Sequence, residues 1–332
     1  MRSQRRLVSP QTQILQDAFL TTWDTRIVSA GSTASNQVLF PVRSYTGVVY
    51  DCVIDWGDGT SNTMWQAFNE AQTLHTYAVE GIYQIKVTGI FPQLYTYNAS
   101  DKLKLISIDN WGSDPTIEWG SVHEKDFYGF PLTVYPSGGD IFSKVTDGNA
   151  MFWVSGLTTL HEDAIFENMT LAYGTFRATA ISSLPSNMNL SKLTDGRLTF
   201  YACSNLVSLP NGLLLSELTN GSNMFQGTKI PTIPNGVTLN KLENGYRMFY
   251  GITQLTSAAN IDLASLTAGV QMFYNVTLNT VDYSNLLIRT EASNPNNNVD
   301  FHGGNSKYNS SASSARASLV SRGWTIADGG LI

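Results

Sequence analysis

The chain has 332 residues, of which 14 % are charged and 11 % are aromatic, and its formal net charge is −6 at pH 7. This length allows a full hydrophobic core and about two domains. Phosphate recognition needs a concentrated basic face, and the basic cluster in the sequence is limited to Arg2, Arg5 and Arg6, so nucleic-acid binding is not expected. The sequence has no run of about 18 apolar residues, so no membrane span is expected either.

Residues 1–18 are predicted to form a polar arm with a short helix over 13–20. The apolar residues of this stretch could anchor the chain to a partner by ordering on contact, and the candidate anchoring residues are Ile14, Leu15, Phe19 and Leu20. The alternative is a disordered tail. The basic start is followed by glutamines rather than by the apolar core of a signal peptide, so no secretory leader is expected in this stretch.

Residues 19–92 carry the β-branched and aromatic runs that are typical of strands, at 38–42, 48–56 and 83–88. A glycine-rich turn over 55–60 separates two of them. Asp58 is expected to cap this turn through its own backbone. The alternative is a calcium ion held by Asp55 and Asp58, but calcium takes six or more oxygen ligands and the sequence shows only two carboxylates locally.

The turn Trp-Gly-Asp-Gly-Thr at 56–60 and the motif His-Thr-Tyr-Ala-x-x-Gly-x-Tyr at 75–83 occur in order within this stretch. The pair resembles the PKD-type immunoglobulin-like domain. The resemblance implies a β-sandwich over 19–92 with aromatic motif residues in its core. The motif residues are Trp56, Asp58, His75, Tyr77 and Tyr83.

Residues 93–126, with a predicted strand at 103–112, are expected to link the sandwich to a repeat array and to form its N-terminal cap. The array is predicted over 127–288, because phenylalanine recurs there in steps of 24 or 25 residues. We expect these side chains to form a buried spine: Phe127, Phe152, Phe176, Phe200, Phe225, Phe249 and Phe273.

Each phenylalanine is followed by a second signature of the form Leu-x-x-Leu-Pro, clearest at 181–185, 206–210 and 230–234. We predict that it forms a short strand stacked on the same strand of the next turn and ended by the proline. Together the two signatures resemble the BspA-type leucine-rich repeat surface proteins. The resemblance implies a mainly β chain, an immunoglobulin-like sandwich followed by a capped leucine-rich-repeat-type solenoid.

Residues 289–332 are expected to form the C-terminal cap. A polar loop at 289–298 precedes a helix over 310–322, on which Ala312, Ala315 and Leu319 share one face, and a last strand over 324–327. The cysteines, Cys52 and Cys203, fall in different predicted domains, so two small buried apolar side chains are favoured over a disulfide.

The sequence lacks the signatures of a nucleophile elbow, a zinc metalloprotease, a P-loop and a dinucleotide fold. The histidines (His75, His123, His161 and His302) lie apart from one another, and no metal, cofactor or catalytic residue is predicted. Paired carboxylates of a glycosidase can lie far apart in a sequence, so a polysaccharide-cleaving hydrolase stays an alternative.

The favoured interpretation is a non-enzymatic structural and adhesive protein of a bacteriophage virion, as a capsid decoration or a tail fibre. Its arm and sandwich would dock on other virion proteins, a homo-oligomer is expected, and the repeats would face a host glycan or protein through exposed Asn, Ser, Thr and Tyr. These residues could instead only solvate a rigid spacer. The alternative placement is a bacterial cell surface, as an adhesin.

Overall fold

The computed structural model describes residues 18–43, 49–65, 70–112, 117–120, 125–133, 135–136, 141–258 and 260–332. The chain divides into two compact units: unit 1 is Met1–Ser121 with Tyr135–Ile141, and unit 2 is Val122–Val134 with Phe142–Ile332. The described residues are 19 % strand and 11 % helix, which confirms the expected β-rich class. Within these ranges no helix is long and apolar enough to cross a membrane.

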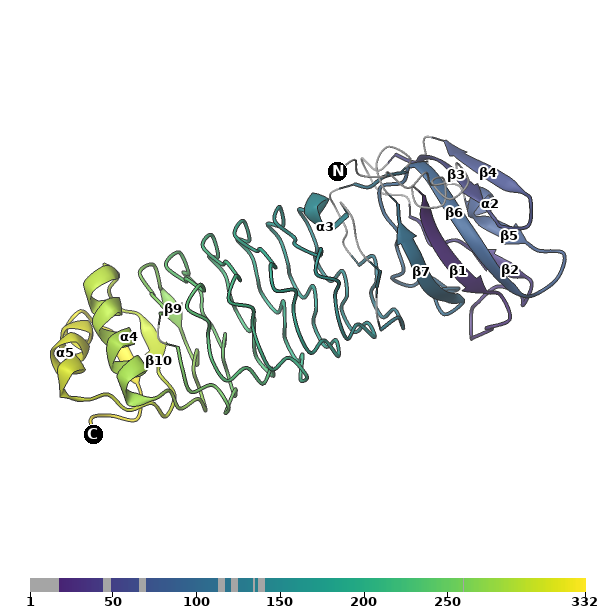
Figure 1. Cartoon of the computed structure of the whole chain (residues 1–332). Helices are drawn as coiled ribbons and strands as arrows, with labels where there is room; N and C mark the ends of the chain where they lie inside the picture. Colours follow the sequence, from purple (N-terminus) through teal and green to yellow (C-terminus); the bar gives the residue numbers. More distant parts are fainter. Residues whose placement is uncertain are drawn as a thin grey trace, which may run out of the picture. The chain divides into compact units, whose positions relative to one another are not determined.

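Unit 1 is built on one large sheet with a small sheet beside it (Figure 1). The large sheet has the order β4-β3-β6-β1-β7 and antiparallel neighbours, and β8 pairs with the end of β6. Its strands are β1 (Phe19–Asp24), β3 (Asp51–Asp55), β4 (Ser61–Trp65), β6 (Ile82–Ile90), β7 (Leu105–Trp111) and β8 (Ile117–Glu118). The small sheet pairs β2 (Gln37–Leu39) with β5 (Leu74–Thr76), next to the short helix α2 (Glu70–Thr73).

An aromatic core lies in unit 1. Alternate residues of the strands point inward, as Cys52 and Ile54 do in β3 and Ile85 and Val87 do in β6. Phe40, which follows β2, packs against Trp23 of β1 and Trp56 after β3, with ring centroids 5.6 and 6.3 Å apart. Contacts of this kind bury large apolar areas and add geometric preference.

The structure differs from the sequence prediction at the C-terminal boundary of the sandwich and at the segment that contains Phe19 and Leu20. The strand expected in the linker is β7, and it pairs along β1 in the sheet of unit 1. Unit 1 therefore extends well past residue 92. Phe19 and Leu20, expected to anchor the chain to a partner from a helical arm, lie in β1 and are buried, because β1 sits between β6 and β7. Ile14 and Leu15 lie outside the described residues.

Unit 2 repeats one turn of chain about every 24 residues, and successive turns stack in the teal-to-green part of Figure 1. Parallel bridges join equivalent residues of neighbouring turns in one row, from Asp147 through Leu171, Asp195, Asn220 and Asn244 to Ala268. The seven repeat phenylalanines are all buried. Their rings stack in one column, with neighbouring centroids 5.1 to 5.6 Å apart. The short helix α3 (Ile141–Lys144) precedes Asp147, the first residue of this row, in the chain.

The row of bridges does not run where the sequence predicts it. It follows the residue five positions before each phenylalanine from Phe152 on, which is Asp or Asn in four turns, Leu171 in one and Ala268 in another. The Leu-x-x-Leu-Pro segments show one bridge, Thr232 to Ser257, in the described part. The apolar residues of those segments do point inward, as Ile181, Leu206 and Ile230 are fully buried. Proline lacks the N–H that a ladder needs, so inward packing survives there without a continuous strand.

Two residues of every turn adopt left-handed backbone conformations, one two positions before the phenylalanine and one two positions after it. The first set is Lys125, Ala150, Gly174, Leu198, Asn223, Arg247 and Gln271, and the second is Gly129, Val154, Ala178, Ala202, Gly227, Gly251 and Asn275. These tight bends turn the chain so that the phenylalanine between them points inward. Glycine adopts this conformation without cost, whereas other residues are strained by it.

Val154 is the β-branched member of this set, with φ +50° and a half-exposed side chain. We expect Val154→Gly to raise the free energy of unfolding of unit 2 by about 1 kcal/mol, because removal of Cβ relieves the strain. Val207 is as exposed but lies outside the left-handed region, so Val207→Gly should lower stability by about 0.5–1 kcal/mol. Thiol labelling of Cys203 at increasing urea concentrations measures the stability of both variants. A loss of stability in Val154→Gly would contradict the strain argument.

Cys203 can report the unfolding of unit 2 because its thiol is free, fully buried and located in that unit. Cys52, also free and buried, can report the unfolding of unit 1. Burial raises the pKa of the Cys203 thiol to about 11 and that of Cys52 to about 12. The thiolate is the reactive form, so labelling reports the opening of each unit separately. As expected from the sequence, both cysteines are free and buried, and the Cys203 thiol in addition donates to the Phe176 carbonyl at 2.9 Å.

A parallel sheet of order β11-β10-β9 continues the row of bridges at the C-terminal end of unit 2. Its strands are β9 (Ala268–Gly269), β10 (Asp300–His302) and β11 (Thr325–Ala327), and the helices beside it are α4 (Thr280–Ser293), η1 (Ser310–Ala312) and α5 (Ser313–Ser321). The expected helix and final strand are present, with Ala312, Ala315 and Leu319 buried. Helix α4 was not expected: the Asn279 side chain caps its N-terminus by accepting from the Asp282 N–H, so the repeats end near 278 rather than 288.

Candidate functional site

The motif residues of unit 1 form a closed cluster around the turn at Asp55–Thr60. Asp58 accepts hydrogen bonds from the Thr60 N–H and hydroxyl, and its other oxygen lies 2.8 Å from Nε2 of His75. The His75 ring stacks on Trp56, with centroids 4.7 Å apart, and Tyr77 donates its hydroxyl to the Trp56 carbonyl. The expected turn cap is therefore present, and it has a histidine partner that the sequence did not indicate.

The surroundings shift two pKa values in this cluster. Burial alone would raise the pKa of Asp58, but hydrogen bonds from Thr60 and His75 outweigh it and lower that pKa. Burial raises the pKa of Tyr77. Trp56 and Tyr77 are buried as expected, whereas Tyr83 is half-buried and donates its hydroxyl to Val79. Asp55 is held by the Gly57 N–H and lies near Lys86, so protein donors engage both carboxylates.

Unit 2 presents a different kind of surface. The residue after each spine phenylalanine is partly exposed, and so are the described residues three positions before it except Ser222, which is buried. Both sets are rich in aromatic and basic side chains, which are half-buried in the described part except for the exposed Arg197. We call them the aromatic edge: Tyr128, Trp153, Tyr173, Arg177, Arg197, Tyr201, Tyr246, Arg247, Tyr250 and Tyr274, where Arg247 stands two positions before its phenylalanine.

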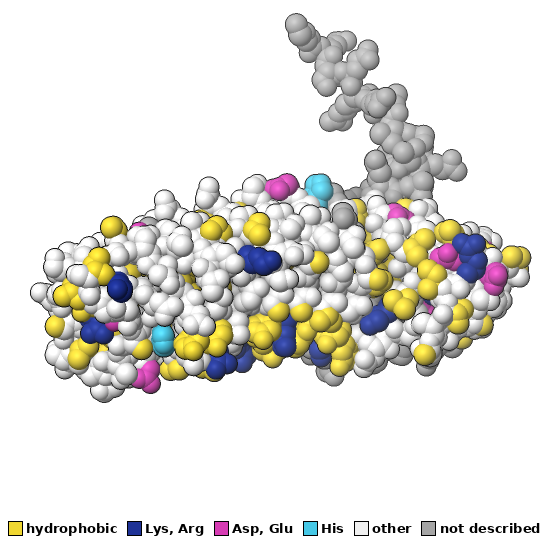
Figure 2. Space-filling model, turned by 90° about the horizontal axis from the view of Figure 1, so that it is seen from below, with side chains coloured by type: hydrophobic (Ala, Val, Ile, Leu, Met, Phe, Trp, Pro, Cys, Tyr) yellow, Lys and Arg dark blue, Asp and Glu magenta, His cyan; other side chains and the backbone are white. Residues whose placement is uncertain are grey.

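Several neighbouring rings of the aromatic edge contact one another, stacked, tilted or edge-on. Tyr250 and Tyr274 lie ring on ring, with centroids 5.0 Å apart, and His302 of β10 continues this row at 5.3 Å. Tyr128 and Trp153 lie 5.7 Å apart at the other end. In Figure 2, hydrophobic and basic side chains alternate along the lower edge of the repeats. The stacked turns thus place planar groups along one edge, with Gln226 between Tyr201 and Tyr250.

The arginines of the edge lie over these rings. Arg177 lies 4.0 Å from the centroid of Trp153 and 5.0 Å from that of Tyr201. Arg197 lies over Tyr173 and forms a bidentate pair with Asp195, the shortest contact being 2.6 Å. Hydrogen bonding to Asp195 raises the pKa of Arg197. Arg247 lies near Tyr246 and Tyr250 and donates to Gln271.

A hollow of about 520 Å³ opens among these groups. It is lined by Lys125, Asn149, Ala150, Trp153, Leu171, Tyr173, Asp195 and Arg197. Aromatic walls with amide, carboxylate, ammonium and guanidinium groups at the rim match the chemistry of a sugar ring, which offers an apolar face and several hydroxyls.

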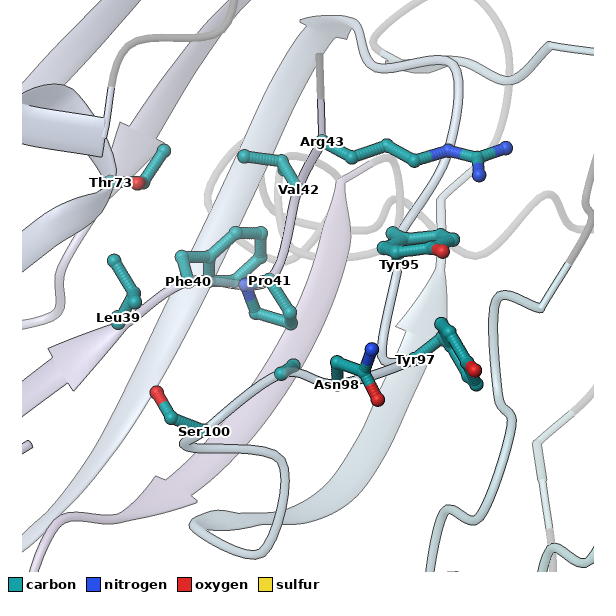
Figure 3. A pocket seen from close by; sticks show the side chains of 11 residues that line it. Leu39, Phe40, Pro41, Val42, Arg43, Thr73, Tyr95, Tyr97, Asn98 and Ser100 are labelled. Carbon is teal, nitrogen blue, oxygen red and sulfur yellow. The ribbon is translucent and has the colours of Figure 1, made fainter. Parts of the chain in front are cut away.

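Unit 1 has a smaller hollow of about 310 Å³, shown in Figure 3. Residues 39–43 form one side of it and residues 95–100 the other, with Thr73 nearby. The Arg43 guanidinium lies 4.1 Å from the centre of the Tyr95 ring. Its lining is mostly apolar or aromatic, so it offers packing surface rather than converging polar groups.

The sequence predicted the buried spine and a polar face in general terms, but none of the edge arginines. The signal that could have found them is positional: residues after each phenylalanine share its period and must face outward when it faces inward. His161 pairs with Asp163 in an exposed turn, and His123 lies outside the described residues. Among the residues that the structure describes, no group of three or more His, Cys, Asp and Glu side chains could hold a metal ion.

Comparisons with protein-family models, with curated proteins and with solved structures give no match for this chain.

Proposed function

We propose that the protein is a non-enzymatic adhesive surface protein that binds a polysaccharide along the aromatic edge of its repeats. The observation that carries this proposal is the set of aromatic and guanidinium groups that contact one another along the edge, with the hollow at Trp153. Repeated weak contacts along a rigid surface add up when the ligand is itself a repeating polymer.

The proposed architecture is an immunoglobulin-like sandwich in unit 1 and a leucine-rich-repeat-type solenoid in unit 2. The two sheets of unit 1, with Trp56 and Tyr77 buried between strands, support the first part. The 24-residue parallel bridges and the buried phenylalanine column support the second. The parallel strands β10 and β11 with helices α4 and α5 would then be its C-terminal cap.

The setting that we propose is the surface of a bacteriophage virion, with unit 1 contacting other virion proteins and copies of the chain assembling together. A bacterial cell surface is the alternative. Mass spectrometry of purified virions tests this directly: the protein should be present in the particles, and its absence from them together with recovery from cell envelopes would favour the alternative.

Trp153→Ala is expected to weaken binding to a recognised polysaccharide about tenfold or more, because loss of a stacked ring costs about 1–3 kcal/mol by analogy with planar ligands. Binding is measured on immobilised polysaccharides extracted from candidate host envelopes. Tyr97→Ala, which removes an aromatic ring from unit 1, is the control and should leave binding unchanged. Equal binding by the wild type and Trp153→Ala would contradict the assigned surface.

The hydrolase alternative is tested on the same polysaccharides. Under the proposed function, incubation with the pure protein leaves their chain length and reducing-end content unchanged. A rise in reducing ends that scales with protein concentration would favour the enzyme instead.

A further inference from the structure

We propose that the polysaccharide bound along the aromatic edge is acidic, and that Arg177 binds its carboxylate groups. This inference rests on the proposed function and adds the chemical class of the ligand. It starts from a difference between Arg177 and the two other arginines of the edge.

Arg197 and Arg247 already have polar partners within the protein. Asp195 balances the charge of Arg197 through a bidentate pair, and Gln271 accepts from Nε of Arg247. Within the described residues, the side chain of Arg177 has neither a hydrogen bond nor an ion pair, and only the rings of Trp153 and Tyr201 hold it. Its guanidinium donors are therefore available to a ligand.

The two rings also hold the guanidinium in place, with its central carbon 4.0 Å from the centroid of Trp153 and 5.0 Å from that of Tyr201. A guanidinium stacked on aromatic rings keeps its N–H groups in the plane of the stack, facing away from the ring faces. This arrangement suits a planar carboxylate, which takes two parallel N–H···O bonds. One uncompensated positive charge matches the single negative charge that each acidic sugar carries.

The turn that holds Arg177 departs from the other turns in a way that builds this arrangement. It has Gly174 at the left-handed position where the neighbouring turns have Ala150 and Leu198. A Cβ at Gly174 would lie 3.2 Å from Cε3 of Trp153, so the glycine lets the indole lie close to the backbone. The same turn has an arginine after its phenylalanine, where the turns on either side have Trp153 and Tyr201. The irregular repeat is thus the one that places a free guanidinium between two rings.

The hollow beside Trp153 supplies the rest of the contact. Arg177 and the hollow share the Trp153 side chain, so a sugar ring against the hollow would bring an exocyclic carboxylate to Arg177. Asn149 and Asp195 at its rim can bond sugar hydroxyls. The net charge of the whole chain is −6, so attraction of an acidic polymer has to come from this local cluster and not from the protein as a whole.

The test compares polygalacturonate with its carboxyl-reduced form, a neutral polymer with the same linkages, in binding to the full chain at low ionic strength. We expect the reduced form to bind at least tenfold more weakly. Arg177→Gln should lose most of the preference, and Arg177→Lys should recover little of it, because an ammonium keeps the charge but not the planar stacking. Lys192→Gln removes one charge elsewhere in the repeats, where Lys192 bonds Asn168, and should behave as the wild type.

Protection of Cys203 from thiol labelling shows that each variant is folded. Equal binding of the two polymers, with Trp153→Ala still weakening both, would overturn the acidic ligand and leave polysaccharide binding in place. Poly-glutamate binding as tight as that of polygalacturonate would overturn the saccharide component. Failure of both polymers to bind would overturn the inference, whereas the proposed function is decided by the envelope polysaccharides.

Discussion

Lys104→Met is expected to lower the free energy of unfolding of unit 1 by about 3–5 kcal/mol, the cost of breaking a buried ion pair by removing one partner. Lys104 and Asp101 have fully buried side chains, and the Nζ of Lys104 lies 3.7 Å from Oδ2 of Asp101. The ammonium donates to the carbonyls of Thr33, Ala34 and Gln37 at 2.8 to 3.1 Å.

Asp101 also holds the segment 33–39, which the Lys104 ammonium contacts. Its carboxylate accepts from the backbone N–H groups of Thr33 and Leu39. Methionine keeps the volume of the lysine stem but leaves this carboxylate and three carbonyls buried without the ammonium. This segment ends in β2, so loss of the Lys104 contacts would also disturb the packing of Phe40 against Trp23.

Thiol labelling of Cys52 in increasing urea measures this prediction, and Cys203 in the same molecule is the internal control, since unit 2 should be unchanged. Lys86→Met is the matched variant: Lys86 lies 3.4 Å from Asp55, both side chains are partly exposed, and the loss should stay below about 1 kcal/mol. Equal effects of the two substitutions would show that burial of the pair does not stabilise unit 1.

Phe200→Ala is expected to lower the stability of unit 2 by about 3–5 kcal/mol. Phe200 is fully buried in the middle of the column, with its ring centroid 5.4 Å from that of Phe176 and 5.5 Å from that of Phe225. Alanine would leave a cavity between two rings that the backbone bridges hold at a set spacing, so the neighbours cannot close it.

Phe200→Leu keeps most of the volume and should cost less than about 2 kcal/mol. Labelling of Cys203, three residues from Phe200, reports both variants, and Cys52 should keep its wild-type midpoint. Because each turn packs against its two neighbours, the substitution removes ring contacts on both sides of Phe200. A loss of less than 1 kcal/mol in Phe200→Ala would mean that the column collapses around the gap and that the ring stack contributes little.

Local and periodic features of this chain could be read from its sequence alone. The 24-residue period placed the phenylalanines of the buried column, because a regular step brings the same side chain to the same place in every turn. The Asp58 turn and the helix with Ala315 and Leu319 also depend on neighbours within a few residues. Turns and helix caps of this kind are predictable because the residues that form them are close together in the sequence.

The tertiary structure alone decided what depends on distant partners. β7 has the composition of any strand, and only its pairing with β1, more than 80 residues away, assigns it to unit 1. The row of bridges runs through Asp195 and Asn220 rather than through the Leu-x-x-Leu-Pro segments, and only the stacking of the turns shows which residues pair. Arg177, Arg197 and Arg247 look alike in the sequence. Which of them lacks a polar partner depends on the side chains that the stacked turns bring beside it, and that difference defines the proposed site.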